Sequence, residues 1–292
     1  MTVTPGTGVT PPPALSAIEL ERRRYRANRA RRSTVVALIS TIVFAAILWV
    51  AVTHAPGWGR VRETYFSGPQ FRSSFPDVLR GLWLNVRILV VAALLIVPTA
   101  LLVATLRTIG SPVFFPVRVL MAMYVDVFRG IPLIVLLYLV GFGVPALGIA
   151  WLPKSGAVLG TLCLVLSYSA YCAEVFRAGI LSVHPSQRAA ARSLGLTQSQ
   201  TMRIVVLPQA VRAVVPPLLN DFVSLQKDVG LVSILGIVDA VRAAQIDNYV
   251  TYNYTPYVVA ALLFVLLAIP SARLADAMVA RSIRRQQAGA IV

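Results

Sequence analysis

Uncharged apolar segments long enough to cross a membrane constrain this sequence more than any other feature. The first extends from Thr34 to Thr53, and 20 residues of α-helix span about 30 Å, the thickness of the hydrocarbon core of a bilayer. Hydrophobic residues make up 57% of the chain and charged residues only 13%, a composition typical of membrane proteins. The sequence therefore predicts an all-α integral membrane protein.

Six transmembrane helices are expected in total. After the first, the predicted spans cover about 82–106, 115–150, 156–178, 205–236 and 255–275. The third of these six should be interrupted near Gly130 and Pro132, because proline removes a backbone hydrogen bond.

Positive charge sets the expected orientation of the spans. Seven arginines precede the first span: Arg22, Arg23, Arg24, Arg26, Arg29, Arg31 and Arg32. Because basic residues are retained on the cytosolic side, both termini are expected there. We interpret 1–32 as a disordered basic tail, 33–54 as the first span, 55–80 as an extracytoplasmic loop and 277–292 as a cytosolic tail. A signal peptide is the rival interpretation of 33–54, but the apolar run is longer than usual and no clear cleavage site follows.

The remaining composition argues against nucleic-acid and metal partners. The net charge of +16 comes from basic residues at the chain ends and between apolar runs, so it suits membrane orientation better than nucleic-acid binding. Cys163 and Cys172 are nine residues apart on one predicted helix, roughly 13 Å along its axis, and cannot form a disulfide with each other. His54 and His184 have no carboxylate nearby at ligand spacing, so no metal site is expected.

A polar segment at 184–206 separates two predicted spans, and the expected orientation places it in the cytosol. Ser186 can cap a short helix, and Gly195 can end that helix in the left-handed conformation. Thr197 and Gln200 fit a capping box that opens a second short helix running towards Pro208. The segment is therefore predicted to form a rigid helix-turn-helix knob.

The residues of this segment alone leave a second interpretation open. Arg188, Arg192 and Arg203 would also favour an amphipathic loop that lies on lipid headgroups.

The spacing within the segment resembles the coupling loop of bacterial ABC importer permeases. It consists of Ala189-Ala190-Ala191, three residues, Gly195, nine residues, and then Val205-Val206-Leu207-Pro208. Three further segments are similar to the polar amino acid family of these permeases: Phe128–Pro132 (FRGIP), Ala173–Gly179 (AEVFRAG) and Asn220–Leu231 (NDFVSLQKDVGL). The resemblance covers about residues 80–275. It implies a type I permease core of five helices at 81–276, to which this chain adds one N-terminal span.

The resemblance implies a function and a set of partners. A permease of this family forms the translocation pathway for an amino acid in the bacterial inner membrane and docks a separate ATPase. The implied docking residues are Arg188, Ala189, Ala190, Ala191, Leu194, Gly195, Leu207 and Pro208. The implied partners are a cytosolic ATPase dimer, a second permease, identical or homologous, and an extracytoplasmic amino acid-binding protein. No catalytic residue or cofactor is expected in this chain, which lacks a G-x-x-x-x-G-K-[ST] run, so ATP would be used by the partner.

The sequence departs from the family pattern at two places. Ala189 stands where the family has Glu, which removes half of a capping box with Ser186. Val229 and Gly230 stand where the family has Thr and Ser. If those hydroxyls contact substrate in relatives, this chain handles a different ligand or relies on its partner for the contact.

Several charged and polar side chains fall inside the predicted spans. One group shares two neighbouring helix faces: Asn220, Asp221, Ser224, Lys227 and Asp228. A charge at the bilayer centre costs roughly 2.5–3.5 kcal/mol, so these side chains should face protein or water. A translocation pathway or subunit interface and a structural hydrogen-bond network both remain open.

Two further predicted pairs, Glu174 with Arg177 and Asp126 with Arg129, are three residues apart, close enough for ion pairs. Glu174 and Arg129 are therefore also possible pathway or interface residues. Near the cytosolic ends of spans, however, such pairs anchor helices more often than they bind substrate.

Two other classes of function are weighed against the permease. An ion-coupled secondary amino acid carrier would use the polar segment at 220–228 and run on an ion gradient alone. An intramembrane enzyme is disfavoured because neither H-E-x-x-H nor G-x-S-x-G occurs.

Overall fold

The computed structural model describes residues 17–109 and 111–289, which form helices joined by short connections, with no β-strand in these two ranges. The described residues up to Val61 and those from Arg62 onward form separate compact units. Five helical stretches are long and apolar enough to cross a membrane, and there are six if a bent helix pair counts as one span. The predicted all-α membrane fold is confirmed.

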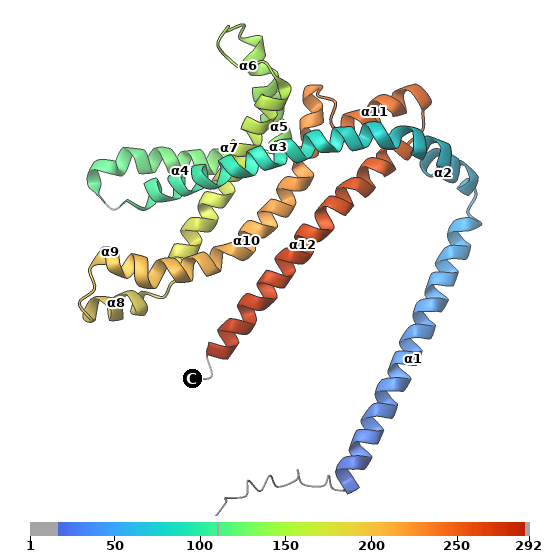
Figure 1. The fold of residues 1–292 in the computed structure, drawn as a ribbon, viewed down its shortest axis with the longest axis horizontal. Helices are drawn as coiled ribbons and strands as arrows, with labels where there is room; N and C mark the ends of the chain where they lie inside the picture. The colour runs from blue at the N-terminus through green and yellow to red at the C-terminus, as the bar shows by residue number, and fades with distance from the viewer. Residues whose placement is uncertain (1–16, 110, 290–292) are drawn as a thin grey trace, which may run out of the picture. The chain divides into compact units, whose positions relative to one another are not determined.

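The first unit contains α1 (Ala17–Thr53), a single uninterrupted helix of 37 residues (Figure 1). The expected disordered tail at 1–32 is therefore wrong for residues 17–32, which are helical, whereas residues 1–16 lie outside the described residues. Nucleation is the costly step of helix formation. Once the apolar span is helical, the Arg, Ala, Glu and Leu residues before it extend the helix at little cost.

Much of the extracytoplasmic loop expected at 55–80 is also helical. It contains α2 (Trp58–Tyr65) and the first residues of α3 (Gly68–Thr108), a 41-residue helix. Pro69 lies in the first turn of α3, where a missing N–H costs nothing because no carbonyl precedes it in the helix. Prolines that suggested a loop in the sequence are thus compatible with a helix start.

The expected interruption near Gly130 and Pro132 is confirmed. After the short 3₁₀ turn η1 (Pro112–Phe114), the chain forms α4 (Phe115–Gly130), α5 (Leu133–Gly141) and α6 (Gly143–Ala146). The stretch from Pro112 to Gly130 and the stretch from Leu133 to Ala146 meet at a bend of 106°. Ile131 is extended, the conformation that a following proline imposes on its neighbour.

Helix α7 (Gly156–Leu181) is the centre of the second unit and packs against α3, α4, α5 and α10. Its Leu159, Leu164 and Ala170 are fully buried. Cys163 and Cys172 are both buried and free, as expected from their spacing.

The remaining elements follow the knob. These are α10 (Leu207–Asp228), the 3₁₀ segment η3 (Val229–Leu235), α11 (Ala240–Thr251) and α12 (Thr255–Gly289). Helix α12 packs against α3, α10 and α11. The end of the second unit that holds α6 and α11 lies opposite the end that holds α8 (Pro185–Ser193) and α9 (Gln198–Gln200) (Figure 1).

A buried polar junction joins α3 to the start of α11. Asn85 and Asp239 are 1% and 0% exposed, and the Asn85 side-chain amide donates to the Asp239 carboxylate over 2.9 Å. The same carboxylate accepts the Arg242 backbone N–H and so caps α11, while the Ala240 N–H donates to the Asn85 side-chain carbonyl.

Helix α3 approaches the start of α11 closely at Gly81, and this close approach makes the polar junction possible. A Cβ at Gly81 would lie 2.3 Å from the Asp239 carbonyl carbon and 2.4 Å from the Ala240 nitrogen, both of which are backbone atoms. Only glycine lets α3 and α11 come this close.

We expect Gly81→Ala to lower the free energy of unfolding of the purified protein by about 1–3 kcal/mol, because the backbone of α11 must move. Thermal unfolding in detergent measures the effect. Gly59→Ala is the matched control, since a Cβ at Gly59 would meet no atom within 4 Å. Equal melting temperatures for the two variants would contradict the close contact.

Candidate coupling knob and membrane cavity

The segment between α7 and α10 forms the predicted knob, but its first helix is capped differently from the expectation. Helix α8 begins at Pro185, and the His184 ring nitrogen accepts the Ser186 N–H over 3.2 Å. The expected cap by Ser186 is wrong because Pro185 takes the first helical position, where its fixed φ is already suitable. His184 therefore has a local structural role that its isolated position in the sequence did not indicate.

The end of α8 and the start of α9 agree with the caps predicted from the sequence. Gly195 has φ +82°, its N–H donates to the Arg192 carbonyl, and the Leu196 N–H donates to the Ala191 carbonyl. This pair of bonds is the Schellman motif that a left-handed glycine allows. The capping box of Thr197 and Gln200 is also confirmed, with both reciprocal hydrogen bonds present.

The second helix of the knob does not end near Pro208, contrary to the expectation. Helix α9, the π-helical turn η2 (Thr201–Val206) and α10 follow one another without a break. Within the π turn the Leu207 N–H donates to the Met202 carbonyl, five residues back. Such a wider turn accommodates Pro208, which has no N–H of its own and would crowd an ordinary turn. The knob is therefore continuous with a span.

The structure divides the implied docking residues between the surface and the interior. Leu194 is 84% exposed, and Ala189, Ala190 and Gly195 are exposed beside it. Leu207 and Pro208 are also exposed. We call Ala189, Ala190, Leu194 and Gly195 the knob surface.

Two implied docking residues face inward instead. Ala191 is only 4% exposed, and the Arg188 guanidinium donates to the Ile180 carbonyl near the end of α7. The side chains of Gln209 and Gln187 are also hydrogen-bonded, which links α8 to α10. These contacts hold the knob on its two neighbouring helices.

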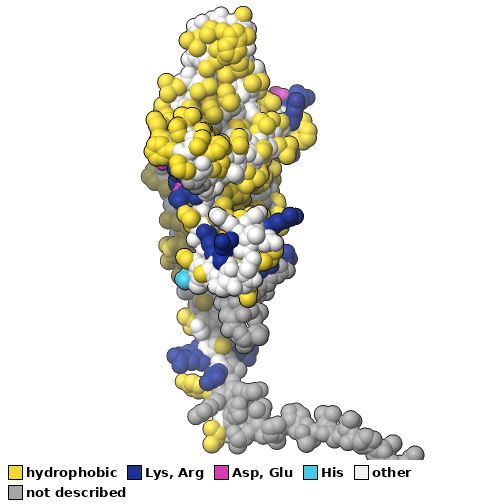
Figure 2. All heavy atoms as spheres, turned by 90° about the vertical axis from the view of Figure 1, so that its left-hand side faces the viewer, with side chains coloured by type: hydrophobic (Ala, Val, Ile, Leu, Met, Phe, Trp, Pro, Cys, Tyr) yellow, Lys and Arg dark blue, Asp and Glu magenta, His cyan; other side chains and the backbone are white. Residues whose placement is uncertain are grey.

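Basic side chains gather around the knob. Figure 2 shows hydrophobic side chains over the upper part of this face and Lys and Arg side chains lower down, over α8 and α9. This distribution agrees with a headgroup or aqueous location for the knob.

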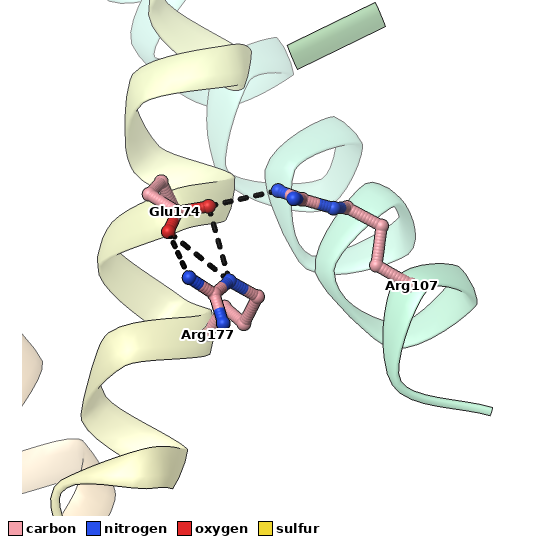
Figure 3. A network of polar contacts seen from close by, with 3 residues as sticks. All are labelled: Arg107, Glu174 and Arg177. Carbon is pink, nitrogen blue, oxygen red and sulfur yellow. Dashed lines mark hydrogen bonds and ion pairs between the residues drawn. The ribbon is translucent and has the colours of Figure 1, made fainter. Parts of the chain in front are cut away.

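A charged cluster joins α3 to α7 near the knob end. The Glu174 carboxylate accepts Arg107 over 2.8 Å and also accepts Arg177 on the next turn (Figure 3). The predicted Glu174–Arg177 pair is thus confirmed, and Arg107 is a partner that the sequence did not reveal because it lies 67 residues away. The Asp126–Arg129 pair is not among the ion pairs of the described residues, since the Arg129 guanidinium lies 5.5 Å from the centre of the Tyr171 ring.

The polar side chains of α10 open onto a cavity of about 470 Å³. Its lining combines the break between α4 and α5 with α7 and α10: Arg129, Gly130, Ile131, Pro132, Leu133, Ser167, Tyr168, Tyr171, Asp221, Ser224 and Asp228. The three α10 residues predicted to share one face do line this cavity. Tyr168 donates to the Asp228 carboxylate over 2.7 Å, and the Cys172 thiol lies 3.8 Å from the Asp221 carboxylate.

Asn220 and Lys227 do not line the cavity but are exposed on the neighbouring face of α10. Val229 and Gly230 lie away from the cavity too. Val229 is 1% exposed in the core, and Gly230 packs close to Phe264 and Val241. In this chain, hydroxyl groups at positions 229 and 230 would therefore contact neighbouring helices and not the cavity.

Tyr168 and Tyr171 are the functional candidates that sequence reasoning missed. They are one helical turn apart within a span, and two phenol groups on one face of a transmembrane helix are a usable signal. In the two described ranges, no group of three or more His, Cys, Asp or Glu side chains could hold a metal ion.

Comparison with known proteins decides the family. Residues 96–284 match the family described as the binding-protein-dependent transport system inner membrane component. The chain belongs to this family. It is an amino acid ABC transporter permease, as the resemblance implied.

Individual relatives agree with this membership. The chain is 38% identical over 159 residues to the probable glutamine ABC transporter permease protein GlnM of Bacillus subtilis, covering 54% of this chain and 72% of the relative. It is 32% identical over 197 residues to the arginine transport system permease protein ArtQ of Bacillus subtilis, covering 66% of this chain and 87% of the relative.

Among solved structures, a crystal structure of an amino acid ABC transporter with histidines has a TM-score of 0.65 and 33% identity, and the match covers 70% of this chain and 94% of that one. The permease core is thus a known fold, and the chain is a multi-pass membrane protein.

We expect Glu174→Gln to lower the free energy of unfolding by about 1–3 kcal/mol, because two partly buried guanidinium groups lose a charged partner. Thermal unfolding in detergent again provides the measurement. Asp77→Asn removes a carboxylate from the exposed Arg80 pair, also three residues apart, and should change stability by less than about 0.5 kcal/mol. If both variants unfold alike, the cluster does not hold α3 to α7.

Proposed function

We propose that this chain is the permease subunit of an ATP-driven amino acid importer and that its knob docks the ATPase. The observation that carries the proposal is the knob itself, which is capped at both helix junctions and presents Leu194 almost fully exposed. The small side chains Ala189 and Ala190, exposed beside Leu194, let another protein approach the backbone of the knob closely. The family membership supports a partner that hydrolyses ATP.

The knob is connected to the cavity by a single helix. From Gln198 the chain stays helical through α10, so a displacement of the knob is transmitted to Asp221, Ser224 and Asp228. The bond from Arg188 to Ile180 connects the knob to α7, which carries Tyr168 and Tyr171. Docking and release of the ATPase would therefore act on both helices that line the cavity.

The partners follow from this assignment. A cytosolic ATPase dimer binds and hydrolyses ATP, a second permease, identical or homologous, completes the pathway, and an extracytoplasmic binding protein delivers the amino acid. This chain would then bind no cofactor and catalyse no reaction. Relatives named for glutamine and arginine support an amino acid as the substrate.

Orientation and domain boundaries belong to the same proposal. The protein lies in the bacterial inner membrane with both termini in the cytosol, since basic residues favour that side and are frequent at the start of α1 and in the knob. The permease domain covers 81–276, with the coupling loop at 184–206.

Uptake of radiolabelled amino acids into vesicles tests the function. With the ATPase and binding protein present, uptake should require ATP, and removal of the ATPase should abolish it. Uptake that continues without the ATPase on a proton or sodium gradient would instead support an ion-coupled secondary carrier.

For the knob, we expect Gly195→Val to reduce co-purification of the ATPase, because a β-branched residue at φ +82° distorts the turn between α8 and α9. Gly195→Asn is the matched control, since asparagine tolerates the left-handed conformation and should retain docking. Equal recovery of the ATPase with both variants would show that this turn does not support docking. Both variants should insert in the membrane normally.

For the cavity, we expect Asp221→Asn to lower ATP-dependent uptake by about tenfold, equivalent to 1.4 kcal/mol, with little change in thermal stability. The substitution preserves shape and removes a charge that faces the cavity. Asp126→Asn is the control, because Asp126 is exposed on α4 and does not line the cavity. Unchanged uptake together with lower stability would assign Asp221 to a structural network.

A further inference from the structure

Helix α1 is longer than a membrane is thick. Its 37 residues correspond to about 55 Å of helix, of which the uncharged run from Thr34 to Thr53 occupies about 30 Å. The preceding residues, 17–33, therefore continue as helix for about 25 Å beyond the hydrocarbon core. This part of the chain precedes the family match, which begins at residue 96.

Four exposed arginines surround this extension where it leaves the membrane. They are Arg26, Arg29, Arg31 and Arg32, which we call the arginine collar. At 100° per residue, their side chains leave the helix in four separate directions. A helix lying on a membrane would instead separate an apolar face from a basic one, so the collar indicates a helix that emerges through the headgroups.

The collar is at the depth of the lipid phosphates. Arg32 and Arg26 precede Thr34 by two and eight residues, which places them about 3 and 12 Å beyond the hydrocarbon boundary. The headgroup layer is about 5–8 Å thick on each side, and the Debye length adds about 8 Å at physiological salt. Long arginine side chains can also bend towards the preferred layer. All four guanidinium groups are thus within range of phosphate.

No described carboxylate of α1 forms an ion pair with the collar. None of the ion pairs between described residues includes a residue of α1, and no Asp or Glu occurs between Arg26 and Arg32. Guanidinium groups bind phosphate through two parallel hydrogen bonds, a geometry that an ammonium group cannot match.

We propose that the arginine collar is a binding site for anionic phospholipid headgroups. Each lipid phosphate would accept two N–H groups from one arginine, and the excess negative charge of the lipid would offset the uncompensated charge of the helix. Zwitterionic lipids would be bound less well because their headgroups add a positive charge. The site is independent of transport, since it shares no residue with the cavity or the knob.

Native mass spectrometry of the full-length chain in detergent tests the site. Phosphatidylglycerol or phosphatidylcholine with identical acyl chains is added after purification, so the orientation of the protein in the cell does not affect the result. The wild type should bind phosphatidylglycerol more tightly than phosphatidylcholine. The variant R26Q/R29Q/R31Q/R32Q should lose at least about tenfold in affinity for phosphatidylglycerol.

Two further variants separate the site from general charge effects. R60Q/R62Q/R72Q/R80Q removes four exposed arginines elsewhere and should bind phosphatidylglycerol like the wild type. R26K/R29K/R31K/R32K keeps the charge but loses the guanidinium fork, and should bind several-fold more weakly than the wild type. Equal lipid affinity for the wild type and the collar glutamine variant would overturn the proposal. So would tighter binding of a short RNA than of phosphatidylglycerol at about 150 mM salt.

Discussion

The hydrocarbon interior of a bilayer contains no water, so each polar group within it must find a partner in the protein or face a cavity. The second unit of this permease meets that requirement in three places. Asn85 donates a hydrogen bond to the Asp239 carboxylate where α3 meets α11. Arg107 donates one to the Glu174 carboxylate where α3 meets α7. The break at Pro132 and the carboxylates of α10 share one lined cavity. At these three places, the charged side chains and the irregular backbone are thus enclosed by protein.

Two helices of the second unit carry both candidate functional regions. Helix α7 contributes Tyr168 to the cavity and ends beside the knob, while α10 contributes Asp228 and is continuous with α9. The π turn before Pro208 is the local feature that preserves this continuity, because it tolerates a proline without ending the helix. An event at the knob and the shape of the cavity are therefore mechanically connected within one subunit.

The chain combines a family core with an additional N-terminal helix. The matches to the Bacillus subtilis relatives imply proteins of about 220 residues, so this chain is longer by roughly one span and its flanks. In the core, buried polar contacts and close helix packing determine the structure. In α1, length and charge are the dominant properties, and they suit interaction with lipid more than with a protein cavity.

The sequence by itself determined the all-α membrane class, the interruption at Pro132, the left-handed Gly195 and the capping box at Thr197, because each depends on neighbouring residues alone. It did not reveal that Pro69 starts a helix, that His184 rather than Ser186 caps α8, or that α9 continues into α10, since local signals there permit more than one outcome. Tertiary structure alone paired Arg107 with Glu174 and Asn85 with Asp239, and brought Tyr168 to Asp228. Those partners are 60 or more residues apart, and only the packing of the helices brings them within hydrogen-bonding distance.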